Sequence, residues 1–273
     1  MRIYFRLKSI EEIKQDLSYL DNYTVSWLDL TDGDLWIEIN EKRLFIYSQN
    51  IMEHWKTDDK FVDYQLDTFT VYFSNLFEFI CKSLSKKLYD LFNNLEDVVK
   101  FNNVLNEYFA IYEDENEERY NAFIPYYHKI SNLCYGRMLS EYPPTGSPCL
   151  YFFRHKDKIK VIWDCEIKNE IGIPLWEADS GIYEMPYIDF VEEVKRFFDK
   201  FIKAMEVQIE NALKTDWGHL KINKDLAKRY PDIKQAYLND LAFLDKNIEE
   251  NNEEIEQIYQ QVLSEIAENY KNE

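Results

Sequence analysis

The chain has few of the residues that build flexible linkers, disulfide frameworks and metal sites. It contains 6 Gly and 7 Pro in 273 residues, which argues against long flexible linkers. Its 4 Cys show no C-x-x-C spacing, so we expect reduced thiols, although Cys149 and Cys165 could face each other across a hairpin. Its 4 His are widely separated and do not form H-E-x-x-H. The sequence therefore predicts neither a metal nor a cofactor.

The chain also lacks the glycine and serine motifs of several large enzyme classes. The absence of G-x-S-x-G, G-x-x-x-x-G-K-[ST] and G-x-G-x-x-G disfavours serine hydrolases, P-loop NTPases and dinucleotide-binding enzymes. Asp29, Asp32 and Asp34 do not form a calcium loop, because Gly33 directly follows Asp32 and too few carboxylates are present. We therefore expect a protein without enzymatic activity, while an enzymatic site assembled from dispersed residues stays open.

Long apolar runs are missing, and negative charge is in excess. No stretch approaches the ~18 apolar residues of a membrane span. The N-terminal MRIYFRLKSIEE lacks the apolar core of a signal peptide, so we expect a cytoplasmic protein. The 51 Asp and Glu outnumber the 32 Lys and Arg, giving a net charge of −19. This charge disfavours nucleic acid and membrane partners and permits a basic protein partner, although solubility alone also explains an acidic surface.

The N-terminal part predicts antiparallel strands. Arg2–Leu7 alternates apolar and polar residues, as a half-buried strand does. Ser26–Ser48 predicts a two- or three-stranded meander with turns at Thr31–Asp34 and Asn40–Lys42, in which Gly33 can adopt positive φ. The core residues expected from this meander are Leu35, Ile37 and Ile39.

The rest of the chain predicts long amphipathic helices around a second hairpin. Cys149–Arg154 and Lys158–Cys165 form that hairpin. Apolar residues recur every three or four positions in three segments, which are Asp59–Leu91, Leu95–Tyr112 and Asp189–Leu213. We therefore predict one α+β domain over residues 1–273, with an antiparallel sheet built from both hairpin regions and covered by helices. A division into two domains near 143–148 is the alternative.

The C-terminal part predicts one long helix over Asp232–Tyr270. Its apolar residues alternate spacings of four and three from Tyr237 to Val262, with Asn251 at one of these positions. One interpretation is a helix packed along the domain. The other is an oligomer that forms a coiled coil through residues 237–262.

The hairpin region carries the most family-like motif. Ser26-Trp27, then Leu30-Thr31-Asp32-Gly33 and Trp36-Ile37, resembles the S-W-x-x-L-T-D-G-x-x-W-I motif of a bacterial family known as a domain of unknown function. The acidic, motif-poor α+β character of the chain also resembles immunity proteins of polymorphic toxin systems. That second resemblance implies a cytosolic protein that binds and blocks a toxin.

The leading hypothesis is a non-enzymatic, acidic protein-binding module, such as an immunity-type inhibitor of a basic toxin or nuclease. The expected partner-binding residues are Asp29, Asp32, Asp34, Glu113, Asp114 and Glu115. The residues expected to have structural roles in the motif are Trp27, Thr31, Gly33 and Trp36. The alternatives are an enzyme or small-ligand binder with a site on a sheet rich in tryptophan (Trp36, Trp163 and Trp176), and a structural oligomer.

Overall fold

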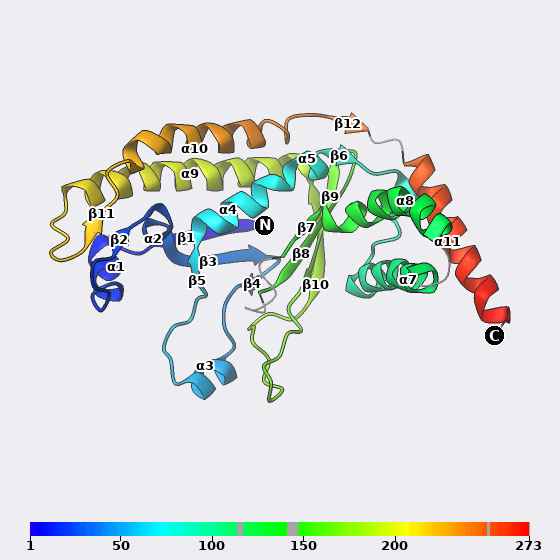
Figure 1. The fold of residues 1–273 in the computed structure, drawn as a ribbon, viewed down its shortest axis with the longest axis horizontal. Helices are drawn as coiled ribbons and strands as arrows, with labels where there is room; N and C mark the ends of the chain where they lie inside the picture. Colours follow the sequence, from blue (N-terminus) through cyan, green and yellow to red (C-terminus); the bar gives the residue numbers. More distant parts are fainter. Residues whose placement is uncertain (114–116, 141–146, 250–251, 273) are drawn as a thin grey trace.

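The computed structural model of the protein describes residues 1–113, 117–140, 147–249 and 252–272. It confirms an α+β fold, in which long helices pack against antiparallel sheets (Figure 1). The two hairpin regions form two separate sheets and not the single sheet predicted, because among the described residues no strand of one region pairs with a strand of the other. The first sheet contains β1 (Arg2–Leu7), β3 (Asp32–Ile39), β4 (Lys42–Leu44) and β5 (Asp63–Gln65). The second contains β7 (Met138–Leu139), β8 (Cys149–His155), β9 (Lys158–Asp164) and β10 (Gly181–Pro186). Two short parallel pairs join β2 (Thr24–Val25) to β11 (Lys221–Ile222), and β6 (Lys82–Ser83) to β12 (Ile248–Glu249).

The helices differ widely in length. The short ones are α1 (Ile10–Asp16), α2 (Trp27–Leu30), α3 (Gln49–Trp55), α4 (Leu66–Asn75), α5 (Phe77–Ile80) and α6 (Lys86–Tyr89). The long ones are α7 (Leu95–Glu113), α8 (Glu117–Tyr135), α9 (Tyr187–Lys214), α10 (Leu226–Leu241) and α11 (Glu253–Asn272). Among the described residues, none of these helices is long and apolar enough to cross a membrane. The predicted helices at Leu95–Tyr112 and Asp189–Leu213 are confirmed as α7 and α9.

In the first sheet, β3 lies between β1 and β4, and β5 pairs with the first residues of β3. Side chains alternate along β3, so that Leu35, Ile37 and Ile39 are buried as predicted. Phe5 of β1 continues this buried face and contacts Phe197 of α9, with ring centroids 5.7 Å apart. The opposite face of the sheet carries half-buried polar and aromatic side chains.

The predicted turn at Thr31–Asp34 is wrong. Thr31 ends α2, and β3 begins at the next residue. Gly33 has no positive φ and lies inside the strand, opposite Leu7 of β1. A Cβ atom added to Gly33 would lie 2.1 Å from the carbonyl oxygen of Arg6. The position therefore favours glycine because β1 approaches too closely for a side chain, and not because of a turn conformation.

The predicted turn between β3 and β4 is confirmed. Asn40 and Glu41 both have positive φ, 47° and 67°, as a two-residue hairpin turn requires. The local sequence chemistry therefore fixes this bend, in contrast to the one predicted at Gly33.

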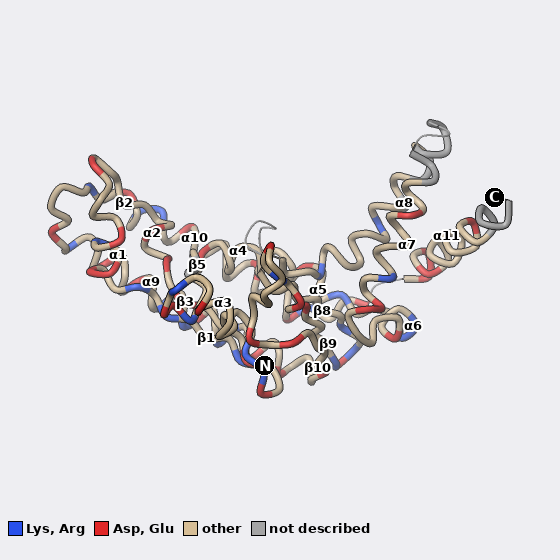
Figure 2. Tube along the Cα trace, turned by 90° about the horizontal axis from the view of Figure 1, so that it is seen from below, with Lys and Arg blue, Asp and Glu red and all other residues tan. Residues whose placement is uncertain are grey.

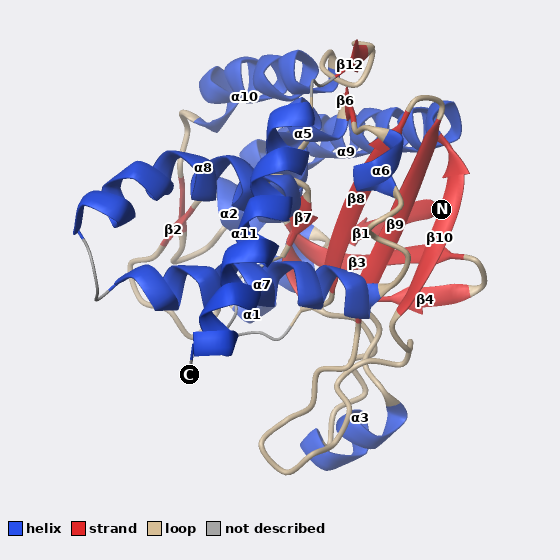
Figure 3. Ribbon diagram, turned by 90° about the vertical axis from the view of Figure 1, so that its right-hand side faces the viewer, coloured by secondary structure: helices blue, strands red, loops and turns tan. Residues whose placement is uncertain are grey.

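In the second sheet, β8 and β9 are buried on both faces. β8 and β9 form the predicted hairpin, with His155 opposite Lys158 at its end. Phe152 faces a first hydrophobic cluster that includes α9, while Phe153 faces a second one under α7, α8 and α11 (Figure 3). Because both faces are covered, these strands appear in the sequence as continuous apolar runs. Each cluster includes residues from both sides of the alternative domain boundary at 143–148.

The long helix predicted over Asp59–Leu91 is also wrong. The chain there forms α4, α5, β6 and α6 in succession. Its backbone leaves the helical conformation to pair with distant segments, because the Leu84 amide donates to the Arg154 carbonyl at 2.8 Å and β6 pairs with β12. Ser85 then caps the start of α6. Each piece keeps its apolar residues at helical spacing, so the sequence pattern does not reveal the interruptions.

The single C-terminal helix predicted over Asp232–Tyr270 is divided. α10 ends at Leu241, and α11 begins at Glu253 on a different part of the fold (Figure 1, orange and red). Tyr237 belongs to the first hydrophobic cluster, whereas Val262 packs with Tyr108 of α7. Asn251 lies outside the described residues. Association through 237–262 as one continuous coiled coil therefore has no structural basis here, and self-association itself stays a prediction.

Candidate functional site

The open face of the first sheet carries three neighbouring aromatic side chains. Tyr4 of β1 is paired with Trp36 of β3, and their rings stack with centroids 5.2 Å apart and an interplanar angle of 10°. Phe61, on the loop before β5, lies against Trp36 with centroids 5.0 Å apart. All three are half-buried. We call this group the aromatic strip, and the packing of its rings against one another holds each ring in place before any partner binds.

The surface beside the aromatic strip is hollowed into a depression of about 810 Å³, which Phe61 also lines. It lies between α1, the first residues of β3 and the loop that precedes β5. Its charged lining consists of six carboxylates and three cations, which are Glu12, Asp16, Asp32, Asp34, Asp58 and Asp59 with Arg6, Lys8 and Lys60. We call this depression the acidic basin. Tyr19, which also lines it, is 80% exposed.

The inner part of the acidic basin is held by ion pairs. Arg6 donates from Nε to Asp34 at 2.7 Å and from Nη1 to Glu12 at 2.9 Å, and Lys8 donates to Asp16 at 2.8 Å. The loop side is more open, since Asp58 and Lys60 are exposed and have no ion-pair partner among the described residues. Carboxylates outnumber cations overall, so the basin keeps a negative charge.

Glu12 is held in its charged form by the start of α1. Its carboxylate accepts hydrogen bonds from the Ser9 backbone amide, at 2.6 Å, and from Arg6, while Ser9 Oγ accepts from the Glu12 amide. These two residues form a reciprocal cap, which gives hydrogen-bond partners to backbone amides that would otherwise be unpaired at the start of α1. The Ser9 amide, then the Ser9 hydroxyl and Arg6, lower the pKa of Glu12 from 4.5 to about 2.

This lowered pKa makes a small part of the stability depend on pH. Because the folded pKa lies below the unfolded one, the contribution of Glu12 is complete above pH 4.5 and is lost as the pH falls towards 2. We expect Glu12→Gln to lower the free energy of unfolding by up to about 1 kcal/mol at pH 7, since the side chain is partly exposed.

Urea unfolding of both proteins between pH 7 and pH 3 measures this difference, which should shrink as the pH falls. Glu11→Gln, on the exposed side of the same helix, is the control. A difference that stays constant over this range would contradict the assigned pKa of Glu12.

The structure separates the three aspartates that the sequence grouped. Asp32 and Asp34 point outward from β3 and line the acidic basin. Asp29 is 9% exposed, and its carboxylate accepts hydrogen bonds from the Tyr23 hydroxyl and from the Ser26 amide and hydroxyl. Asp29 therefore helps to cap the start of α2 and is not part of the acidic basin.

The second acidic segment predicted to bind a partner cannot be placed in the same way. Glu113 is the last residue of α7, and its side chain lies outside the described part of the structure. Asp114 and Glu115 lie outside the described residues. Their role stays a prediction.

The motif residues other than Gly33 and Trp36 lie around α2. Thr31 is fully buried, and its hydroxyl donates to the Leu28 carbonyl at 2.8 Å while its own carbonyl accepts from the Leu66 amide. Trp27 packs against Tyr230 of α10, with ring centroids 5.8 Å apart. The motif thus joins α2, α4 and α10 to the edge of the first sheet.

Four buried charged residues were not predicted from the sequence. One is Arg137, which donates to the Leu133 carbonyl at 3.2 Å. Arg154 donates to the carbonyls of Lys156, Cys81 and Lys246 and stacks on Tyr187, 3.9 Å from its ring centroid. Lys160 donates to the carbonyls of Tyr89 and Phe92, both at 3.0 Å, and burial lowers its pKa. The fourth is Glu193, in α9. Arg154 and Lys160 are each a single cation inside an apolar strand, and this was the signal in the sequence that could have identified them. Their partners in the structure indicate a structural role.

The proposed groove between sheet tryptophans does not fit their burial. Trp163 is 3% exposed, and its indole donates to the Asp179 carbonyl at 2.8 Å. Trp176 is 4% exposed and stacks on Tyr47. Of the three candidate tryptophans, Trp36 alone reaches the outward face. The other two anchor the core, as their strand positions also allowed.

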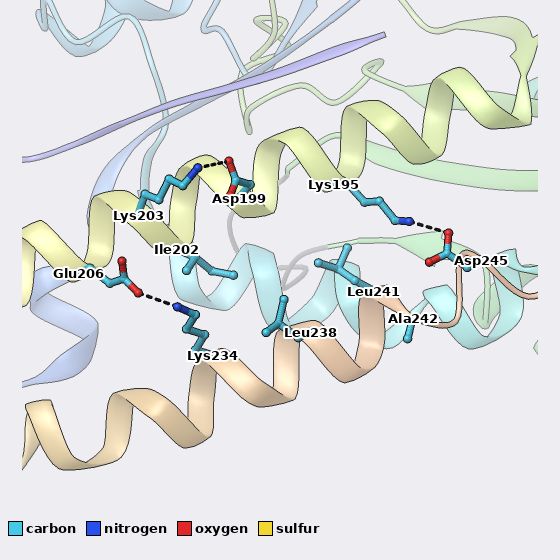
Figure 4. Close-up of a pocket in the computed structure, with 10 residues that line it drawn as sticks. All are labelled: Lys195, Asp199, Ile202, Lys203, Glu206, Lys234, Leu238, Leu241, Ala242 and Asp245. Atoms are coloured by element: carbon cyan, nitrogen blue, oxygen red, sulfur yellow. Dashed lines mark hydrogen bonds and ion pairs between the residues drawn. The ribbon is translucent and has the colours of Figure 1, made fainter.

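A second depression, of about 420 Å³, lies between α9 and α10 (Figure 4). Its apolar lining consists of Ile202, Leu238, Leu241 and Ala242. Its charged lining forms three ion pairs, which are Lys195–Asp245, Lys203–Asp199 and Lys234–Glu206. We call this depression the α9–α10 groove. Among the described residues, no group of three or more His, Cys, Asp or Glu is placed to hold a metal ion.

Charged residues of both signs lie along β1 and β3 near the acidic basin, and acidic residues recur along α11 (Figure 2). Comparison with curated proteins and with solved structures finds no match. A protein-family model, described as a family of unknown function (DUF5984), matches residues 2–261. The match spans nearly all of the chain, including both sheets and the α9–α10 pair. This protein therefore belongs to the DUF5984 family.

Proposed function

We propose that this protein is a non-enzymatic binding module for a cationic protein, acting in the bacterial cytoplasm as an immunity-type inhibitor. The observation that carries the proposal is the position of the acidic basin directly beside the aromatic strip on one open sheet face. A negative depression attracts a basic surface, and pre-fixed aromatic rings can anchor it.

Electrostatics supports this division of roles. The net charge of −19 attracts a cationic protein from a distance of several ångströms, beyond which dissolved salt screens the attraction. Within the basin, Arg6 already shows that a guanidinium fits between two of its carboxylates. A partner's arginine or lysine could pair in the same way with Asp58, which is exposed.

The aromatic strip and Tyr19 supply the contact area that charges cannot. Exposed charge pairs contribute little net affinity, whereas aromatic side chains that become buried at an interface often dominate it. Phe61 links the two regions, since it both packs against Trp36 and lines the basin. In this proposal, inhibition results from covering the basic active-site face of the bound protein.

The proposal predicts a salt-dependent association rate. A partner isolated from the native cells at low salt is purified and mixed with the protein in a stopped-flow instrument. We expect the association rate to fall several-fold between about 50 and 300 mM salt, with a smaller change in dissociation. The double variant Asp58→Asn/Asp59→Asn should slow association several-fold at low salt.

The matched control is Glu210→Gln/Asp225→Asn, which removes the same charge from exposed positions outside the basin. This control should associate at nearly the wild-type rate. A partner that is itself acidic, or equal effects of the two double variants, would contradict the proposed role of the acidic basin.

A further inference from the structure

The α9–α10 groove has an apolar floor between charged walls. Ion pairs between the two helical segments cross it at each end, at Lys195–Asp245 and at Lys234–Glu206 (Figure 4). Between them, Ile202 and Leu241 are 6% and 8% exposed and form the floor, while Leu238 is 44% exposed. The groove therefore offers an apolar floor and one apolar side chain that solvent still reaches.

The charges of the groove balance. Its three lysines pair with three carboxylates, in a molecule whose net charge is −19. A cationic protein gains no attraction at a neutral surface, so the partner of the acidic basin is not favoured here. Two copies of this chain repel each other over most of their surface, and a neutral apolar patch is where that repulsion is weakest.

We propose that the α9–α10 groove is the interface between two copies of this chain. A two-fold interface uses the same patch on both copies, so it needs a surface that carries both a projection and a matching depression. Leu238 and the groove beside it supply these on one face. In the dimer, Leu238 of each copy enters the apolar groove of the other.

The size of this surface predicts a weak dimer. The 16 residues of α10 extend about 24 Å, and two helices side by side cover about 20 Å, which gives a few hundred Å² per copy. Stable dimers bury about 800 Å² per copy, so we expect weak and reversible association. Salt should strengthen this dimer, because it screens the repulsion between two copies that each carry −19. This is opposite to the effect expected for a cationic partner.

The test is sedimentation velocity of the full chain between about 1 and 300 µM, a range wide enough to detect a weak dimer. We expect a concentration-dependent dimer that tightens as salt is raised. Leu238→Glu should weaken it at least tenfold. Val99→Glu, on α7, is the control, because it adds the same charge at a similar exposure of 45% outside the groove.

Thermal unfolding and circular dichroism show whether both variants fold as the wild type does. A wild-type chain that stays monomeric at high salt would overturn the proposal. The proposal would also be overturned if the Leu238→Glu variant dimerised as tightly as the Val99→Glu variant. A monomer that binds a small apolar dye, and loses that binding in Leu238→Glu, would assign the groove to a small ligand instead.

Discussion

Replacing Glu193 with alanine is expected to lower the free energy of unfolding by about 3–5 kcal/mol, the usual cost of removing one partner from a buried charge network. The Glu193 carboxylate, on α9, accepts hydrogen bonds from the Ile3 amide at 2.6 Å, from Arg2 at 2.9 Å and from Arg196 at 2.7 Å. Its side chain is 2% exposed. Alanine would leave the Ile3 amide and two guanidinium groups without their shared acceptor.

The pKa of Glu193 shows which influence is stronger at this site. Burial acts to raise it, but the hydrogen bonds from Arg196, the Ile3 amide and Arg2 together lower it. The carboxylate is therefore charged when folded. Because the folded pKa is lowered, its contribution to stability is present above its ordinary value of 4.5 and is lost as the pH falls below it.

Urea unfolding at pH 7 measures the effect, with Glu192→Ala as the matched control. Glu192 is the exposed neighbour on the same helix, so the control makes the same chemical change without the buried network. We expect the control to differ from wild type by less than about 0.5 kcal/mol. Equal midpoints for the two variants would show that Glu193 does not join β1 to α9.

The local parts of the fold could be predicted because the chemistry that determines them is contained in a few consecutive residues. The reciprocal cap of Ser9 and Glu12 starts α1, and Asn40 with Glu41 bends β3 into β4. The hairpin of β8 and β9 follows from two apolar runs around a short polar turn. None of these depends on a distant segment.

The interruptions of the long helices could not be predicted, because distant contacts cause them. β6 is extended where it meets β12, more than 160 residues later, and no glycine or proline marks that point. The regular spacing from Tyr237 to Val262 likewise continues across two helices with different neighbours. Periodicity reports that a residue is buried, and it does not report that the helix is continuous.

The candidate site was predictable only in part, for the same reason. Asp32 and Asp34 alternate with core residues of β3, so their outward position follows from the strand pattern. Glu12 lies on α1, whereas Asp58 and Phe61 lie on the loop before β5, and only the folded chain brings these two segments to one depression. Asp29 is an acidic residue in the same segment as Asp32 and Asp34, but its carboxylate accepts a hydrogen bond from the Ser26 amide at the start of α2.

Substituting Gly33 is expected to have the second large effect, about 3 kcal/mol for alanine, at the upper end of overpacking costs. The Cβ atom would lie 2.1 Å from the Arg6 carbonyl oxygen, and that neighbour is backbone, which cannot rotate away as a side chain can. The pairing of β1 with β3 must therefore open at Leu7, next to the ion pair of Arg6 with Asp34 in the acidic basin.

Asparagine at the same position distinguishes a strand from a turn. At a turn with positive φ, Asn is tolerated better than Ala, because its side chain bonds to the local backbone. In a close-packed strand both substitutions place a Cβ at the same point and Asn adds further atoms, so Gly33→Asn should destabilise at least as much as Gly33→Ala. Glu38→Val, an outward position of the same strand, controls for the change in strand preference and should unfold near the wild-type midpoint. Thermal unfolding of the three variants measures this, and a Gly33→Asn variant clearly more stable than Gly33→Ala would restore the turn. Gly33 lies between Asp32 and Asp34 in β3. Replacing it should therefore also displace these two carboxylates of the acidic basin. We expect both Gly33 variants to lose stability and partner association together.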